Sequence, residues 1–338
     1  MIAIWHEGAL GDLLLSRLAF RVIRKKHPEE KIFLFARQEA RFLFVEAGLV
    51  DKALPTSLSL INERISLLYL FSHTRSLKEL LSPFVRRLIP VSTRPQGRLH
   101  LALQEAISLG TLPEGGLFLK ERTSQGEFLL LHPGSGAPYK CLPPFLWRRL
   151  GEEWERRGEK IIFLLGPAEE GLKEYFPPEK TVLSFSVRET VKIILKTRAF
   201  LGHDSGLSHL AAALGAPTLA IFGPTPWWHW APFGRVMVGK VACSCLEEKR
   251  DPHTCNPSCL KRLSFKSLFS LSELFLNTTA RSGLPGVVEP GLAPHFRSQP
   301  VEGAEVEDSF QRLEEPEMWV PELGIQVVEV AGEHFLKG

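Results

Sequence analysis

The feature that most constrains the fold of this chain is an alternation of short apolar runs with amphipathic helical segments, which occurs twice. In the first unit, apolar runs at residues 2–6 and 31–36 flank a segment whose apolar residues recur at helical spacing. The strands expected over the two units are residues 2–6, 31–36, 67–71, 88–92, 128–132, 160–165, 199–202 and 217–222. After a first helix ended by Pro28, the expected helices are residues 39–47, 144–157, 186–197 and 205–214. This order predicts an α/β fold of two doubly wound, mostly parallel sheets, with ligands in a crevice beyond the carboxyl ends of the strands.

The 338 residues are enough for two domains with cores of their own. A stretch bearing Gly and Pro at residues 112–126 separates the two units, so we expect domains at residues 1–125 and 126–276. Residues 277–338 carry 4 Lys and Arg against 11 Asp and Glu, whereas the rest of the chain carries 37 against 27. The end of the sequence is therefore predicted to be an acidic, Pro/Gly-rich and partly irregular extension, in which residues 319–330 have the composition of a strand or small hairpin.

A basic body suits anionic ligands or an anionic membrane surface. The positive charge is interleaved with acidic residues and lacks the aromatic and basic stripes of nucleic-acid modules, so we expect no nucleic-acid partner. No apolar run approaches the roughly 20 residues that span a bilayer, and the first residues read as a strand rather than a secretory leader. These features predict a cytoplasmic protein.

The first turn from strand to helix, residues 8–12, contains Gly8, Gly11 and Asp12. It is not the Gly-x-Gly-x-x-Gly turn of dinucleotide-binding proteins, and Arg37 rather than an acid follows the second strand, which disfavours a nicotinamide enzyme. The two glycines would let the backbone approach a substrate and place the Asp12 carboxylate at a helix N-terminus that faces the crevice. The alternative is that Asp12 only caps the helix.

The turn after the first strand of the second unit contains Ser135, Gly136 and Lys140. Free amides, a hydroxyl and a cationic side chain together are suited to phosphate oxygens. The turn is not a P-loop, because no Gly-Lys-Ser/Thr sequence is present, and a purely structural glycine-rich turn is the alternative.

Residues 202–209 again lead from a strand end into a helix. The amides of Ser205, Gly206 and Leu207 would form an anion-binding helix N-terminus, and Asp204 could accept hydrogen bonds from sugar hydroxyls. His209 with Ser205 could suggest a serine hydrolase, but no Gly-x-Ser-x-Gly elbow surrounds the serine. We favour a buried, hydrogen-bonded histidine over a catalytic one at position 209.

Taken together, Gly8-Ala9-Leu10-Gly11-Asp12, His132-Pro133-Gly134-Ser135 with Lys140, and residues 204–212 followed by Phe222-Gly223-Pro224-Thr225 resemble the heptosyltransferases of lipopolysaccharide core biosynthesis, glycosyltransferase family 9. The resemblance covers about residues 1–276 and extends to Cys255 and Cys259. It implies a GT-B fold of two Rossmann-like domains facing a central cleft. It also implies a transferase of the inverting, metal-independent kind that uses no cofactor and moves a heptose or related sugar from a nucleotide sugar, typically ADP-heptose. The implied acceptor is a lipid A–core glycan or similar glycan at the cytoplasmic face of the inner membrane.

By position, the resemblance makes Asp12 the general base that takes the proton of the acceptor hydroxyl. It assigns Ser135, Gly136 and Lys140 to the donor diphosphate. It also assigns donor binding to Asp204 and to the amides of Ser205, Gly206 and Leu207. Glu169 would accept a hydrogen bond from the ribose of the donor. Gly11 and His209 are candidate supporting residues. His203 departs from the family pattern, in which most members carry Asn.

Two further features have competing interpretations. Cys243, Cys245, Cys255 and Cys259 could bind zinc, but their spacing is not that of common zinc sites, and a structural loop is favoured. Residues 71–98, which include Arg86 and Arg87, carry six Lys and Arg against one acid. They could be a solvated helix face. Alternatively, together with Arg17 and Arg21 of the first helix, they could meet the acceptor phosphates and an anionic membrane. The alternatives for the whole chain are a GT-B transferase using a UDP- or GDP-sugar and a catalytically silent carbohydrate-binding relative.

Overall fold

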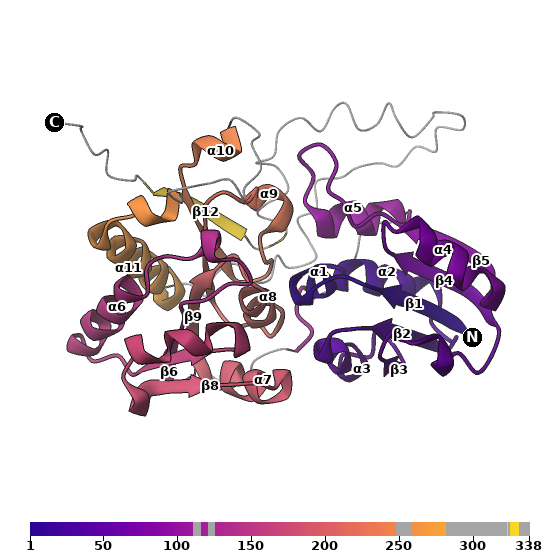
Figure 1. The fold of residues 1–338 in the computed structure, drawn as a ribbon, viewed down its shortest axis with the longest axis horizontal. Coiled ribbons are helices and arrows are strands. Elements are labelled where there is room, and N and C mark those ends of the chain that lie inside the picture. The colour runs from indigo at the N-terminus through magenta and orange to yellow at the C-terminus, as the bar shows by residue number, and fades with distance from the viewer. Residues whose placement is uncertain (111–115, 121–125, 248–258, 282–322, 324, 331–338) are drawn as a thin grey trace.

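The computed structural model describes residues 1–110, 116–120, 126–247, 259–281, 323 and 325–330. Its strands form two sheets that lie side by side (Figure 1), and every strand pairing in these residues is parallel. The expected α/β class with two parallel sheets is therefore confirmed. A division of the chain at residue 125 remains a prediction.

The first sheet has five strands in the order β3-β2-β1-β4-β5. Its strands are β1 (Ile2–His6), β2 (Ile32–Ala36), β3 (Lys52–Leu54), β4 (Ile65–Phe71) and β5 (Val85–Val91). Its helices are α1 (Leu10–Leu15), α2 (Arg17–Lys26), α3 (Phe42–Glu46), α4 (Arg75–Leu81) and α5 (Leu101–Ser108), with short 3-10 turns at Glu39–Arg41, Leu58–Leu60 and Ser82–Phe84. The sequence pattern predicted one helix before Pro28, but Ser16 divides it into α1 and α2.

The second sheet has seven strands in the order β12-β11-β10-β9-β6-β7-β8. Its strands are β6 (Phe128–His132), β7 (Ile161–Leu165), β8 (Thr181–Leu183), β9 (Thr197–His203), β10 (Thr218–Phe222), β11 (Val236–Val241) and β12 (Ile325–Val330). Its helices are α6 (Pro144–Arg156), α7 (Val187–Lys196), α8 (Gly206–Ala213), α9 (Trp227–Trp230), α10 (Ser244–Glu247) and α11 (Phe265–Arg281). Short 3-10 segments cover Pro138–Lys140, Pro167–Tyr175, Pro178–Lys180 and Cys259–Arg262.

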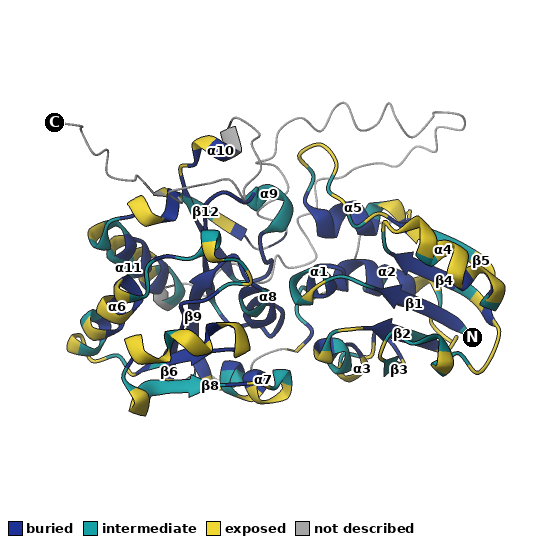
Figure 2. Cartoon of the chain, in the orientation of Figure 1, coloured by how far each residue is buried: buried dark blue, intermediate teal, exposed yellow. Residues whose placement is uncertain are grey.

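Alternating residues of each central strand face opposite layers, as the period of a strand requires. In β1, Ile2 and Ile4 pack with α1, α2, α3 and α5, whereas Ala3 and Trp5 face the layer that contains α4. The first of these layers continues into the second sheet, where it includes residues of α7 and α8. One apolar core therefore joins the two units. Helices α1 and α8 meet at this junction, and Figure 2 shows that α8 is largely buried and that α1 is buried toward its C-terminal end.

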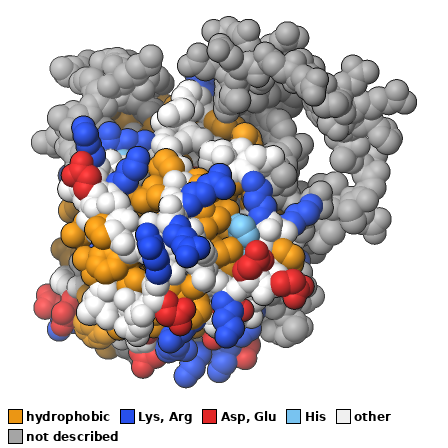
Figure 3. Space-filling view, turned by 90° about the vertical axis from the view of Figure 1, so that its right-hand side faces the viewer, with side chains coloured by type: hydrophobic (Ala, Val, Ile, Leu, Met, Phe, Trp, Pro, Cys, Tyr) orange, Lys and Arg blue, Asp and Glu red, His pale blue; other side chains and the backbone are white. Residues whose placement is uncertain are grey.

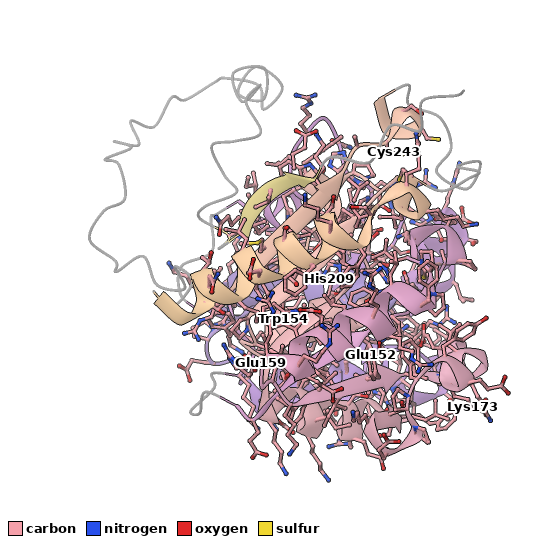
Figure 4. All side chains as sticks on the ribbon, turned by 90° about the vertical axis from the view of Figure 1, so that its left-hand side faces the viewer. Glu152, Trp154, Glu159, Lys173, His209 and Cys243 are labelled. Carbon is pink, nitrogen blue, oxygen red and sulfur yellow. The ribbon has the colours of Figure 1, made fainter. Side chains whose placement is uncertain are left out.

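The end of the chain is more closely tied to the second sheet than its composition suggested. Helix α11 continues to Arg281, past the expected boundary at residue 276, and lies over α6, where Trp154 Nε1 donates to Ser272 Oγ at 3.0 Å (Figure 4). Strand β12 pairs with β11, which confirms the strand composition of residues 319–330 for Ile325–Val330. Leu323 is also described, whereas residues 282–322, 324 and 331–338 of the acidic extension lie outside the described ones. In the part of the chain that the structure describes, no helix has both the length and the apolar character needed to cross a bilayer.

Candidate active site

Asp12 lies in the first turn of α1, directly after the carboxyl end of β1. Its Oδ2 accepts a hydrogen bond from the Ala9 amide at 2.9 Å, so the carboxylate caps its own helix, as the structural alternative expected. Burial raises the pKa of Asp12; the Ala9 hydrogen bond and the charge of Lys140 oppose this rise, and the charge of Asp204 adds to it. The charges of Lys140 and Asp204, both from the second unit, therefore act on Asp12. A carboxylate with a raised pKa is better suited to accept a proton than an ordinary exposed one.

Lys140 and Asp204 form an ion pair, with Nζ 2.6 Å from Oδ2. Lys140 ends the turn after β6, and Asp204 follows β9, the neighbouring strand of the sheet. Ser135 Oγ donates to the Asp204 carbonyl at 2.7 Å and ties the same two loops together. The structure thus brings Ser135, Lys140 and Asp204 into one cluster, whereas Gly136 in the same turn is exposed.

The N-terminus of α8 lies next to this cluster. Ser205 is its N-cap, and its Oγ accepts from the Ser208 amide at 3.3 Å. The amides of Gly206 and Leu207 come before that bond in the first turn, where an α-helix provides no carbonyl partner. These amides and the Lys140 ammonium supply the positive charge that an anionic ligand would need here.

Two glycines allow α1 and α8 to pack closely. A Cβ added to Gly11 would lie 3.0 Å from the His209 ring, and one added to Gly206 would lie 3.1 Å from Leu10. This contact places the helix of Asp12 against the helix that begins beside Asp204. Gly11 and His209, each predicted as a supporting residue, are thus in contact across the junction of the two units.

His209 is buried, as favoured from the sequence, but its Nδ1 has no hydrogen-bond partner among the described residues. Burial lowers its pKa to about 3, and the nearby Arg17, His100 and Lys140 add to that effect. The ring is therefore neutral at physiological pH and contributes packing rather than charge to the site.

Glu169, predicted to accept a hydrogen bond from the donor ribose, has a hydrogen-bond partner within its own turn. It is buried, its Oε2 accepts from the Gly166 amide at 2.9 Å, and its side chain lies against the backbone of Gly134. The carboxylate thus caps the turn after β7, and the Glu169 side chain packs against Gly134, the residue before Ser135. A contact with the donor ribose remains a prediction.

The structure does not bring Arg86 and Arg87 to the cluster. Both lie at the beginning of the edge strand β5 rather than on a helix, and Arg87 is in register with Leu67, which pairs with Ile2. Asp12 follows the other end of β1, at His6. That end lies four residues from Ile2, or about 13 Å at the usual rise of a strand. Figure 1 shows β5 at the outer side of the first sheet, away from the second unit. Lys and Arg side chains do gather on that outer face (Figure 3).

Arg17 is also not available to a ligand, which corrects the expectation that it would meet an acceptor or a membrane. Its guanidinium is fully buried and donates to the carbonyls of Leu14, Leu117 and Phe233, at 2.7, 2.8 and 2.6 Å. Because Phe233 belongs to the second unit, Arg17 is a structural bridge between the units. Arg21 donates to Phe118 in the same region.

His203, the departure from the family pattern, is fully buried. Its Nε2 accepts from the Leu142 amide at 2.8 Å, and its Nδ1 is 3.3 Å from the Gly134 carbonyl. Trp147 Nε1 also donates to Nε2, at 3.3 Å. The imidazole therefore fixes the two ends of the Ser135–Lys140 loop rather than contacting a ligand itself.

Three polar residues near Asp12 were missed from the sequence. His6 and Ser16 are fully buried and 3.1 Å apart, and Glu105 of α5 is fully buried with no hydrogen-bond partner for either oxygen among the described residues. Burial raises the Glu105 pKa well above its usual 4.5, the charge of Asp12 raises it further, and Ser16 opposes the shift. Two sequence signals were available: His6 ends an otherwise apolar strand, and Glu105 is the one acid in α5.

The described residues contain no cluster of three or more His, Cys, Asp or Glu side chains arranged to hold a metal ion. Cys243, Cys245 and Cys259 are buried in the core of the second unit, and Cys259 lies against Gly223. Cys255 is outside the described residues, so the choice between a zinc site and a structural loop stays open.

Comparison with known proteins gives consistent results. Residues 66–258 match the model described as glycosyltransferase family 9 (heptosyltransferase). The chain is 33% identical to lipopolysaccharide heptosyltransferase 1 of Pseudomonas aeruginosa over 119 residues, 30% of this chain and 34% of that protein. It is 24% identical to lipopolysaccharide heptosyltransferase 3 of Escherichia coli over 121 residues, 33% and 36% of the two chains. The chain thus spans about a third of the length of these curated relatives.

Solved structures match over a longer region. E. coli ADP-heptose lps heptosyltransferase II has a TM-score of 0.67 and 16% identity, covering 83% of this chain and 100% of that one. E. coli heptosyltransferase WaaC with ADP has a TM-score of 0.64 and 15% identity, covering 81% and 99%. These likenesses concern the fold.

Two Rossmann-like parallel sheets with polar loops meeting where α1 and α8 pack define the GT-B fold class, as expected. Because the family model matches more than half of the chain, the chain belongs to glycosyltransferase family 9. Asp12 lies outside the matched residues, so its role rests on the geometry of the site.

Proposed function

We propose that this protein is an inverting, metal-independent glycosyltransferase that moves a heptose from ADP-heptose to a lipopolysaccharide core or similar glycan. One observation carries the proposal: the Asp12 carboxylate of the first unit lies within electrostatic reach of the Lys140–Asp204 pair of the second. A base for the acceptor and a cationic site for the leaving group are thereby on opposite sides of one junction.

In the proposed reaction, Asp12 accepts the proton of the acceptor hydroxyl as its oxygen attacks the anomeric carbon of the donor. The bond from that carbon to the diphosphate oxygen breaks in the same displacement, so the anomeric configuration inverts. Lys140 and the amides of Gly206 and Leu207 stabilise the charge that develops on the departing nucleoside diphosphate. Ser135 and Asp204 hold the two donor-side loops together.

The choice of donor and acceptor draws on the relatives. The matched curated proteins are named lipopolysaccharide heptosyltransferases, and one structure of the same fold contains ADP and another ADP-2-deoxy-2-fluoro heptose. A lipid A–core acceptor would bring the protein to an anionic membrane surface from the cytoplasmic side. The basic outer face in Figure 3 is compatible with such peripheral contact.

The test combines binding and turnover. ADP, UDP and GDP are compared by thermal shift, because a ligand that prefers the native state raises the melting temperature. Transfer is then measured from ADP-heptose to a lipid A–core acceptor that lacks heptose, with and without EDTA, and the anomeric configuration of the product is determined by NMR. We expect stabilisation by ADP, a heptosylated product of inverted configuration and no effect of EDTA.

Each part of the proposal has an outcome that contradicts it. Selective stabilisation by UDP or GDP would mean that the donor is a UDP- or GDP-sugar rather than ADP-heptose. Loss of activity in EDTA would show that the reaction requires a metal. Binding of ADP without transfer to any glycan acceptor would indicate a silent carbohydrate-binding relative.

A further inference from the structure

His6 occupies an unusual position for a polar side chain. It is fully buried at the end of β1, with the Phe71 ring 5.6 Å and the Phe20 ring 6.4 Å from its own ring. A buried polar group costs free energy unless it is hydrogen-bonded. The hydrogen bonds of His6 therefore show what the imidazole does at this place.

The ring bridges the two ends of α1. The Gly8 amide, before the helix, donates to Nδ1 at 3.2 Å, and Nε2 lies 3.1 Å from the hydroxyl of Ser16, the residue that ends the helix. Because Nδ1 accepts, a neutral imidazole carries its proton on Nε2 and donates it to Ser16 Oγ. Burial lowers the pKa of His6 to about 3, which is consistent with the neutral form.

Both ends of α1 that His6 bridges contact Asp12. Ser16 Oγ donates to the Asp12 carbonyl at 3.1 Å. On the other side, Gly8 lies so close that an added Cβ would be 2.6 Å from the Asp12 Cβ and 2.7 Å from Cε1 of His6. The His6 ring, Gly8 and the Asp12 side chain are thus packed in succession, with room only for a glycine between the two side chains.

We propose that His6 is a positioning residue for Asp12. The His6 ring holds the short helix α1 at both ends, through Gly8 and Ser16. This inference rests on the proposed role of Asp12 as the base. Helix α1 has six residues, too few to be stable without tertiary contacts, so the orientation of the carboxylate depends on how its ends are fixed. A small displacement of a reacting group is sufficient to slow a reaction strongly.

Three substitutions separate the two bonds of the ring. His6→Asn keeps an acceptor near the position of Nδ1, His6→Gln keeps a donor near the position of Nε2, and His6→Phe removes both at similar size. Ser16→Ala removes the second bond from the other side. His27→Phe is the matched control, because His27 is a histidine of the same unit that bonds to Tyr69 at 2.8 Å, away from Asp12.

We expect His6→Phe to lower kcat for heptose transfer by about 10- to 100-fold, with the Kd for ADP unchanged because the donor-side residues belong to the second unit. His6→Asn, His6→Gln and Ser16→Ala should each lower kcat by less than His6→Phe, and His27→Phe should leave it unchanged. In an Asp12→Asn background, His6→Phe should cause no further loss, because a residue that acts through Asp12 has nothing left to position.

The results distinguish this inference from the proposed function. If Asp12→Asn leaves only a small residual rate and the His6 and Ser16 variants turn over like the parent, only the positioning role is wrong. If His6→Phe lowers the residual rate of Asp12→Asn by the same factor as that of the parent, His6 supports the fold in general, which also overturns the inference. If Asp12→Asn itself remains active, the proposed base is wrong and the inference fails with it. Should His6→Phe not fold, the Asn, Gln and Ser16→Ala variants provide the same comparison.

Discussion

Lys140 Nζ lies 2.6 Å from Asp204 Oδ2, although 64 residues separate the two in the chain. The Asp204 side chain is only 9% exposed, so its charge is largely removed from water and depends on this partner. The pair joins the loops that follow β6 and β9, which are neighbouring strands. A diphosphate bound at the α8 N-terminus would share the Lys140 ammonium with Asp204, and the charges of both groups act on the pKa of Asp12.

Asp12→Asn should reduce transfer to a small residual rate while leaving ADP binding nearly intact, because the amide fills the same volume but cannot accept the acceptor proton. Loss of a general base costs about 10²- to 10⁴-fold in rate. Steady-state kinetics test the loss of turnover, and calorimetric titration tests the unchanged affinity for ADP. Since burial raises the Asp12 pKa, the acidic limb of the parent's kcat/KM profile should lie above pH 3.8, the usual value of the group. Retained turnover in the variant would return Asp12 to a purely capping role.

Lys140→Ala should weaken ADP binding and slow transfer. One charge-assisted hydrogen bond contributes roughly 1.5 to 3 kcal/mol, equivalent to about a 10- to 100-fold rise in the Kd for ADP. Lys173→Ala is the control, because Lys173 is an exposed lysine of the same unit. Calorimetry that gives the same Kd for Lys140→Ala and the parent would show that Lys140 serves only its pair with Asp204.

Arg17→Met should lower the free energy of unfolding by at least about 1 to 3 kcal/mol, because buried carbonyls of Leu14, Leu117 and Phe233 lose their donor. Arg75→Met should change it by less than about 0.5 kcal/mol, since the Arg75 side chain is 93% exposed. Urea unfolding of the two variants provides the measurement. Equal effects would mean that the buried guanidinium does not hold the two units together.

Glu105→Gln should change how stability depends on pH. The Glu105 pKa is raised well above 4.5 in the folded protein, so above pH 4.5 the unfolded chain releases a proton that the native state retains. Below pH 4.5 both states hold the proton, and Glu105 causes no loss of stability. As the pH rises above 4.5, the free energy of unfolding falls by up to about 1.4 kcal/mol per pH unit until the raised pKa is reached. Glutamine removes this term. Urea unfolding at pH 5, 6 and 7 should show the variant gaining on the parent as pH rises, and a difference independent of pH would contradict the buried, protonated state.

Arg86→Glu with Arg87→Glu should weaken binding to anionic vesicles, and that binding should fall steeply with ionic strength. Because both residues lie about 13 Å along the sheet from the Asp12 end of β1, donor affinity and turnover of a deacylated acceptor should be unchanged. An increase in KM confined to the lipid-linked acceptor would support an acceptor-side role exerted through the membrane surface. Vesicle pelleting equal to that of the parent would leave the two arginines as ordinary surface residues.

The sequence by itself determined the local structure and the candidate residues. The apolar runs of β1, β6, β9 and β10 and the helical periodicity after them depend on neighbouring residues only, so the two parallel sheets could be predicted. The same holds for the polar turns at the strand ends, where Asp12, Lys140 and Asp204 were identified. A turn after a strand of a parallel sheet lies at its carboxyl edge whatever the rest of the chain does.

Only the tertiary structure decided which of these residues meet and which are buried. Arg17 was expected to meet an acceptor or a membrane, but it is fully buried, and its partner Phe233 in the second unit is 216 residues away. The strand expected at residues 88–92 begins earlier, at Val85, so Arg86 and Arg87 lie on an edge strand. Strand β12 joins the second sheet after a long separation in sequence. His6, Ser16 and Glu105 gave little signal because their importance comes from packing around α1. The physical reason is that periodicity records contacts within a few residues, whereas strand order and the packing of α1 on α8 bring together groups whose separation in the chain carries no pattern.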